Sequence, residues 1–324
     1  MLSLSSSQVK NFSRLGQRAA YGQSLLRLAD IHSDIFCLSA DLGNSSGLDR
    51  FISRYPSRYL NVGIAEQNLI GVSAGLSSVG FNCFASSFAP FITMRCCEQI
   101  RMNLGYMREN VKIVSLGSGI SMGYLGNSHF GLEDISIILA QNDIPIFCPS
   151  DTTMLDSIIC FLSTHTGPAY LRLTGAASSG SLIYQSSIDV TIGGSVTLHN
   201  GSDILILSHG FVTSTCFEVV KNFLLADNIS CHLEDVYCVH PIGSQILELL
   251  SRFDKVVVLE EHRQYGGLYT QICEVIAREN LSIALIPITL PNSFLVSGSY
   301  IELLSYYHLD YTGIWNKIQG FYSL

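Results

Sequence analysis

The chain has few charged residues and no long run of one sign. Only 14% of its 324 residues are charged, and the formal net charge is −8 with no visible basic stripe. A nucleic-acid-binding face needs clustered lysine and arginine, so we do not expect the protein to bind nucleic acid. Hydrophobic residues make up 48% of the sequence, which is enough for a large core, and the length suits two domains.

Long hydrophobic runs are also lacking. The mean hydropathy is high at +0.33, yet no uninterrupted apolar run approaches the length of a membrane span. The first twelve residues lack a basic region followed by an apolar run, so we expect no signal peptide and a loose segment there. The runs of Ile, Val and Leu instead predict strands of a parallel sheet, buried on both faces.

None of the ten cysteines forms a CxxC pair. Cys96 and Cys97 are adjacent, a spacing that suits neither a metal site nor a mutual disulfide. We therefore expect free thiols that pack as small apolar side chains, in a reducing, cytoplasmic setting.

Strand-like and helix-like segments alternate along the chain. Apolar residues recur at helical spacing over 15–29, and the stretches 35–42, 81–86 and 111–117 are typical of buried strands. This alternation predicts an α/β fold of two doubly wound domains, each with a mostly parallel sheet flanked by helices. We place the first domain at 13–178, a Ser-rich linker at 179–192 and the second domain at 193–324.

Three sequence blocks, in order, carry a family resemblance. They are NVGIAEQN (61–68), SFAPFITMRCCEQIR (87–101) and GNSHFGLEDI (126–135). Together they resemble the pyrimidine-binding domain of transketolase-type thiamine diphosphate enzymes. The words LEEH and GGL and the ending LDYTGIWNKI resemble the C-terminal domain of the same family.

The resemblance implies a catalytic role for Glu66. In such enzymes a carboxyl group hydrogen-bonds a ring nitrogen of the cofactor's aminopyrimidine, which then removes a proton from the thiazolium ring. Glu66 has the apolar neighbours Ile64, Ala65, Leu69 and Ile70, and such surroundings disfavour a free carboxylate charge. Read without the resemblance, Glu66 is a carboxylate at the start of a helix.

Two aromatic residues are the implied partners of the pyrimidine face. Phe88 and Phe91 lie about one helical turn apart, and aromatic rings pack well on a flat heterocycle. Without the resemblance the pair is ordinary core. Asp41, which follows a strand, matches an acid near the cofactor and the subunit interface, and otherwise is a loop acid at a strand end.

His129 follows a glycine-rich loop and matches the family histidine that points into the active site. An imidazole there can donate to a developing oxyanion or move a proton near neutral pH. Arg18, Ser45 and Arg172 match positions that bind a sugar phosphate, and arginine suits bidentate phosphate contact. Read without the resemblance, His129 is a helix-capping or core histidine, and Arg18, Ser45 and Arg172 taken singly are more typical of surface or capping positions.

Three positions depart from the family pattern. Leu125 stands where many transketolases have an aspartate that contacts the donor's hydroxyl, four residues before the histidine. Gly117 stands at a phosphate-contacting histidine, and Met94 at a third aromatic residue near the pyrimidine. These changes predict a less polar donor pocket and a modified, for example deoxy, sugar.

The diphosphate-binding half of a transketolase is missing. That half bears a GDG word and a downstream Asn that hold magnesium and the diphosphate, and this sequence has no GDG. The chain thus resembles the C-terminal subunit of a split transketolase. The resemblance implies thiamine diphosphate as cofactor, Mg²⁺ held mainly by a separate N-terminal subunit that carries the GDG motif, and an α2β2 assembly that is inactive as the single chain.

The implied reaction is the transfer of a two-carbon ketol unit from a ketose, phosphorylated or modified, to an aldehyde. Two alternatives stay open. One is acyl transfer of the 2-oxo acid dehydrogenase beta or deoxyxylulose-phosphate synthase type, and the other is a non-catalytic scaffold subunit. Glu66 argues against a scaffold, whereas Leu125 is compatible with one.

Overall fold

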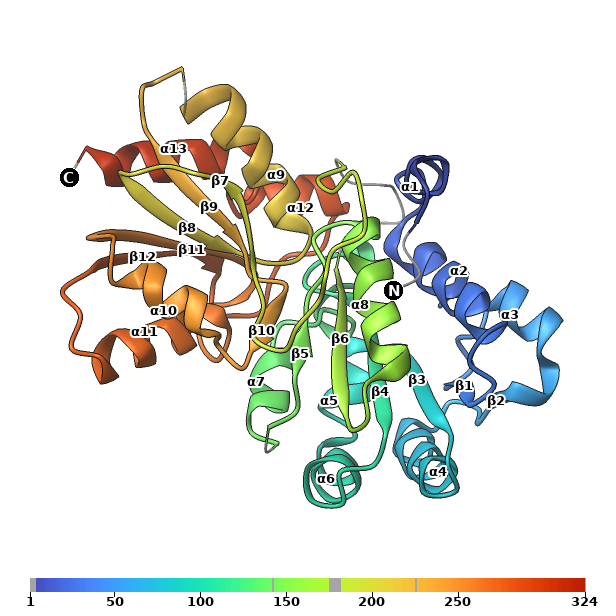
Figure 1. Cartoon of the computed structure of the whole chain (residues 1–324). Coiled ribbons are helices and arrows are strands. Elements are labelled where there is room, and N and C mark those ends of the chain that lie inside the picture. The colour runs from blue at the N-terminus through green and yellow to red at the C-terminus, as the bar shows by residue number, and fades with distance from the viewer. Residues whose placement is uncertain (1–3, 142, 175–181, 225, 324) are drawn as a thin grey trace.

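Two α/β units lie side by side in the computed structural model (Figure 1). The structure describes residues 4–141, 143–174, 182–224 and 226–323. Each unit is a central sheet with helices on both faces, so the predicted fold class is confirmed. Among the described residues, no helix has both the length and the apolar character needed to cross a bilayer.

The first sheet has seven strands in the order β10-β5-β6-β4-β3-β1-β2. All neighbours are parallel except β10 and β5. The strands are β1 (Ile35–Ser39), β2 (Tyr59–Asn61), β3 (Asn82–Phe88), β4 (Val111–Ser118), β5 (Ile146–Phe147), β6 (Ala169–Thr174) and β10 (Cys238–His240). The central strands are buried along their whole length, as expected for parallel strands covered on both faces.

Helices cover both faces of this sheet. One face packs on α1 (Ser6–Phe12), α2 (Gln17–Ala29), α3 (Asp49–Arg54) and α8 (Thr152–Thr164). The other packs on α4 (Glu66–Ser78), α5 (Ala89–Thr93), α6 (Cys97–Gln99), the π-helix Ile100–Tyr106 and α7 (Asp134–Leu139). The core on this second face runs on without interruption into the second unit, so the two units share apolar packing.

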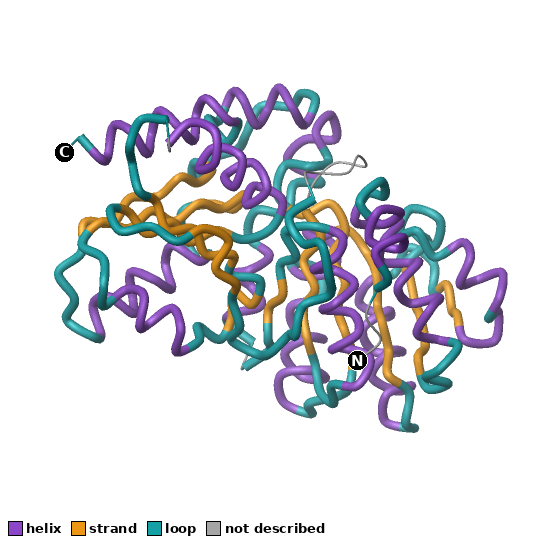
Figure 2. Tube along the Cα trace, turned by 45° about the horizontal axis from the view of Figure 1, so that its top comes forward, coloured by secondary structure: helices purple, strands orange, loops and turns teal. Residues whose placement is uncertain are grey.

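The second sheet has five strands in the order β12-β11-β8-β9-β7, with only β7 antiparallel to its neighbour. The strands are β7 (Val196–His199), β8 (Ile204–Ser208), β9 (Cys231–Asp235), β11 (Lys255–Arg263) and β12 (Ala284–Leu290). Figure 2 shows helices on both sides of it. These are α10 (Ser244–Leu250) and α11 (Leu268–Arg278) on one face, and α9 (Phe211–Val219), α12 (Tyr300–Tyr306) and α13 (Tyr311–Tyr322) on the other.

One local prediction is wrong. The N-terminal segment is not loose, because α1 begins at a Ser5–Gln8 capping box and buries Val9 and Phe12. Residues 89–106 are divided among α5, α6 and the π-helix and do not form one continuous helix.

The chain also crosses between the two units. Strand β10, which follows the second sheet's β9, joins the edge of the first sheet beside β5, and Cys148 N–H donates to Tyr237 O at 2.8 Å. Part of the predicted linker, 179–181, lies outside the described residues. In the rest, the Asp151 carboxylate accepts the Ile183 and Tyr184 N–H groups at 2.9 Å each, which fixes the linker to α8.

Candidate active site

Most of the predicted site residues lie at one end of the first sheet, where its parallel strands have their carboxyl ends. Asp41 follows β1, Glu66 follows β2, Phe88 ends β3, and the loop with His129 follows β4. Ligands of open α/β sheets bind at this edge. Segments up to ninety residues apart thereby meet in one place.

Glu66 is the first residue of α4 and is only 3% exposed. It does not cap the helix, because Ala65 is the N-cap and no side chain bonds the first turn. Its Oε2 lies 2.6 Å from Arg95 Nη1, and its Oε1 accepts from Ser87 Oγ at 3.4 Å. The positive end of the α4 dipole also favours a carboxylate here.

Phe88, Phe91 and His129 form a cluster of three rings. The Phe88 and Phe91 centroids are 6.2 Å apart, and the His129 centroid lies 5.7 Å from Phe88 and 5.1 Å from Phe91. All three contacts are edge-to-face, and all three side chains are half-buried. Ser128 Oγ lies 2.9 Å from His129 Nδ1 and helps to orient the imidazole.

Arg95 was not singled out from the sequence, although it lies within the second block. It follows Phe91 by four residues, and its guanidinium carbon lies 4.5 Å from the Phe91 ring centroid while Nη1 bonds Glu66. The planar cation therefore lies against both an aromatic face and the buried carboxylate. The available signal was its place in the second sequence block, four residues after Phe91, although the structure places Arg95 in the turn between α5 and α6.

A cavity of about 410 Å³ opens beside the ring cluster. Residues of both units line it: Pro90, Phe91, Met94, Arg95, Asn127, Ser128, Phe130, Leu132, Glu133, Arg263 and Phe294. The side chains of Met94 and Leu125, which replace polar or aromatic residues of the family, are both about half exposed. Met94 lines the cavity.

Arg18 and Ser45 lie close together. Arg18 Nη1 lies 3.4 Å from Ser45 O, and both residues are accessible to solvent. Asp41 is exposed, and its Oδ1 accepts from Asn61 Nδ2 at 2.9 Å. Gly47 allows the close approach between the Ser45 loop and the helix that carries Arg18. Any side chain at Gly47 would collide with Arg18 O, and the residue has a positive φ of 79°.

Arg172 does not join this pair, and its predicted phosphate contact is corrected by the structure. The side chain is fully buried in β6, with Nε 2.8 Å from Asp134 Oδ2. Its Nη2 donates to Gly131 O and Glu261 O at 3.0 Å each. A guanidinium enclosed in this way is not available to a phosphate from solvent.

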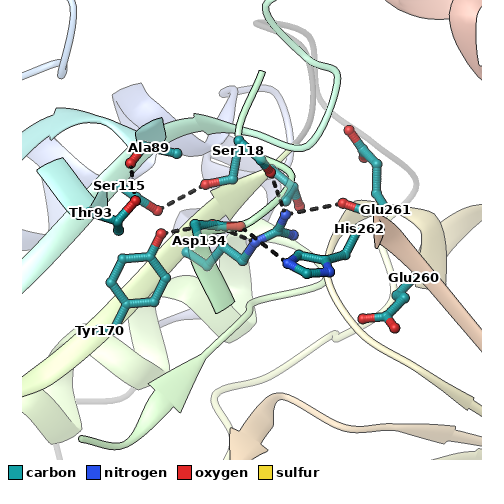
Figure 3. A network of polar contacts seen from close by, with 12 residues as sticks. Ala89, Thr93, Ser115, Ser118, Asp134, Tyr170, Glu260, Glu261 and His262 are labelled. Atoms are coloured by element: carbon teal, nitrogen blue, oxygen red, sulfur yellow. Dashed lines mark hydrogen bonds and ion pairs between the residues drawn. The ribbon is translucent and has the colours of Figure 1, made fainter. Parts of the chain in front are cut away.

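Asp134 and Arg172 belong to a buried polar network between the two units (Figure 3). Tyr170 OH donates to Asp134 Oδ2 at 2.7 Å, and His262 of β11 lies nearby. Burial alone would raise the pKa of Asp134, but the Arg172 and His262 charges and these hydrogen bonds bring it below its usual value. Burial lowers the pKa of His262 despite the acidic neighbours.

Gly117 is covered by Met122. The glycine has φ 65°, and an added side chain would overlap the Met122 thioether. A histidine at this position would require the Met122 side chain to move and the backbone to keep a conformation that is strained for residues other than glycine.

Comparisons with known proteins point to the same family. The family model described as "Transketolase, pyrimidine binding domain" matches residues 14–177, and that described as "Transketolase, C-terminal domain" matches residues 193–314. A putative transketolase C-terminal section of Methanocaldococcus jannaschii is 34% identical over 94% of this chain and 95% of its own length.

Two further relatives are similar over nearly their whole length. An apulose-4-phosphate transketolase subunit of Phocaeicola vulgatus is 28% identical over 92% of this chain and 94% of its own. A solved structure, described as "Split gene transketolase, inactive beta4 tetramer", has a TM-score of 0.86 and 32% identity, covering 96% of this chain and 99% of that one. The chain therefore belongs to the transketolase family and corresponds to the section with the pyrimidine-binding and C-terminal domains.

Proposed function

We propose that the chain is the pyrimidine-binding subunit of a split, thiamine diphosphate-dependent transketolase. It transfers a two-carbon ketol unit from a ketose, phosphorylated or modified, to an aldehyde. The observation that carries the proposal is the buried Glu66 carboxylate, which Arg95 links to the cluster of Phe88, Phe91 and His129 rings at the carboxyl ends of the strands.

The residues fit the pyrimidine half of the cofactor. A flat, basic heterocycle needs one buried acid and an aromatic wall, and Glu66 with Phe88 and Phe91 supplies both. The planar Arg95 guanidinium contacts both the Glu66 carboxylate and the Phe91 ring. The carboxylate and the ring together therefore accommodate a planar cation with N–H donors. Arg95 is 46% exposed, which leaves it free to turn toward solvent.

When bound, thiamine diphosphate supplies the nucleophilic carbon for cleavage of a ketose carbon–carbon bond. Glu66 holds a proton against a pyrimidine nitrogen. The contact of Ser128 with His129 Nδ1 leaves Nε2 available to the substrate oxygen, where the imidazole would move a proton. Arg18 and Ser45 bind an anionic group of the substrate, and Asp41 lies near the cofactor.

The diphosphate and its magnesium ion are assigned to another chain. Within the described ranges, no group of three or more His, Cys, Asp or Glu side chains is arranged to hold a metal ion. The proposed partner is an N-terminal subunit with the GDG motif, in an α2β2 complex in the cytoplasm. The similar split-gene transketolase is described as inactive in its beta4 form, which supports the need for a partner. We retain domain boundaries of 13–178 and 193–324, with 179–192 as linker and β10 exchanged into the first sheet.

Reconstitution tests this function. The chain is mixed with its candidate partner, Mg²⁺ and thiamine diphosphate, and a panel of ketose phosphates is screened for two-carbon transfer to an aldehyde. We expect transfer by the mixture and its loss in Glu66→Gln, which keeps the shape of the side chain but not its acid. Full activity of Glu66→Gln would favour the scaffold alternative, and turnover by the single chain would refute the split-enzyme proposal.

A further inference from the structure

The loop that carries His129 is attached mainly to the second unit rather than to the first. Gly119 and Gly131 close its base through two backbone hydrogen bonds, Gly119 N to Gly131 O at 2.8 Å and Gly131 N to Gly119 O at 3.0 Å. Between these two glycines the chain leaves the first sheet, and it returns to begin α7. Its contacts with the second unit therefore decide where His129 lies.

Glu261 of β11 holds the start of this loop. Its carboxylate is buried and accepts the Ile120 N–H through Oε1 at 2.7 Å and the Tyr300 hydroxyl through Oε2 at 2.7 Å. The approach is so close that any side chain at Gly119 would overlap the Glu261 carboxylate. Burial raises the pKa of Glu261 to about 7, and when the carboxyl group is ionised both bonds are charge-assisted and belong to the stronger hydrogen bonds in proteins.

Asn127 forms a second attachment, two residues before His129. Its amide makes a reciprocal pair with the Leu295 backbone: Nδ2 donates to Leu295 O at 2.7 Å, and Leu295 N–H donates to Oδ1 at 2.7 Å. Side chains at Gly123 and Gly126 would come within 2.7 Å of Gly298 O and 2.9 Å of Ser297 Oγ. The 295–298 segment thus lies directly against the loop backbone.

Apolar packing also attaches the loop to the second unit. The loop residues Ile120 and Phe130 are buried in the core cluster of the second unit, together with Leu295 and Tyr300. His129, adjacent to Phe130, instead contacts Phe88 and Phe91 of the first unit. The histidine is therefore presented to the first unit by a loop that is fastened to the second.

We propose that Glu261 and Asn127 are positioning residues through which the C-terminal domain sets the place of His129 in the active site. The inference rests on the proposed function for its catalytic part. Its structural part, the attachment of the loop 119–131, stands independently. Displacement of a reacting group by about 1 Å can cost about 100-fold in rate, so loosening this attachment affects chemistry more than binding.

Hydrogen–deuterium exchange of the full-length chain tests the attachment. Glu261→Ala removes both acceptors, and we expect exchange of the 119–131 segment to rise about 10- to 100-fold. Glu261→Gln keeps an oxygen for Ile120 N–H, so its exchange stays within about threefold of the wild type. The matched control is Glu133→Gln, which removes the charge from another contact between the units, Glu133 to Arg263 at 2.8 Å, but does not alter a bond to the loop 119–131.

The assembled complex tests the catalytic part. We expect Glu261→Ala to lower kcat about tenfold or more with KM within about twofold, and Glu261→Gln to restore most of the rate. Asn127→Ala provides a second route if Glu261→Ala does not fold, with faster exchange of 119–131 and a similar fall in kcat.

Either of two results overturns the inference. One is loop exchange in Glu261→Ala and Asn127→Ala no faster than in the Glu133→Gln control. The other is an equal loss of kcat in the Gln and Ala variants of Glu261. Absence of turnover by the wild-type complex would count against the proposed function, and the exchange comparison would then decide the inference alone.

Discussion

Replacing Arg172 by methionine removes the guanidinium but keeps much of the side-chain length. Asp134 would remain with its carboxylate buried, bonded by Tyr170 but without its cation. The acceptors Gly131 O and Glu261 O would also lose their donor. Breaking a buried ion pair from one side costs about 3–5 kcal/mol, and both members of this pair are fully buried.

Urea denaturation measures this loss. With a slope of about 3 kcal/mol per molar, the midpoint of the transition should fall by at least about 1 M. The double variant Arg172→Met with Asp134→Asn leaves no unpaired charge and should recover about 2 kcal/mol or more. The control Arg278→Met breaks an exposed pair with Glu279 and should change stability by less than about 0.5 kcal/mol.

The same experiment separates the two interpretations of Arg172. If Arg172 were a surface residue that binds a phosphate, its replacement would cost little stability. If the unfolding free energy of Arg172→Met lies within about 0.5 kcal/mol of the wild-type value, the buried ion pair does not stabilise the fold as argued. Phosphate binding would then again be the better interpretation of Arg172.

Three other predictions concern the site and the fold. Arg95→Met frees the Glu66 carboxylate, so the complex should bind thiamine diphosphate about fivefold more tightly by calorimetry, and weaker binding would show instead that Arg95 contacts the cofactor. His129→Ala should lower kcat of the complex about 100-fold without changing cofactor affinity, and an unaltered kcat would remove His129 from the mechanism. Burial raises the pKa of Asp235 to about 7; because this lies above the value in the unfolded chain, its contribution favours folding at low pH and is lost as the pH rises toward 7. Asp235→Asn should therefore reduce the fall in unfolding free energy between about pH 5 and 7, and an identical pH dependence in both proteins would contradict the assignment.

Much of the fold follows from local sequence patterns. The strand 35–39 is apolar up to its last residue, Ser39, and is buried throughout, because a parallel sheet is covered on both faces. The edge strand β10 has no such signal, since it consists of three residues and pairs with β5, about ninety positions earlier in the chain. Helix α1 was missed because its polar residues conceal two buried apolar positions, Val9 and Phe12.

The site could be predicted only where single residues carry the chemistry. Glu66, Phe88, Phe91 and His129 lie together as the sequence blocks indicate, although their roles stay a prediction. The contacts of Arg172 depend on an acid from a different element. A lone arginine in a strand does not reveal whether its guanidinium reaches solvent or a buried partner.

Co-purification with a GDG-bearing partner, followed by calorimetric titration with thiamine diphosphate and Mg²⁺, tests the central claim most directly. We expect binding by the mixture and no binding by this chain alone, because the metal and diphosphate contacts are assigned to the partner. Binding by the isolated chain would contradict the split arrangement. A mixture that forms a stable complex but binds no cofactor would contradict the catalytic proposal and favour a scaffold subunit.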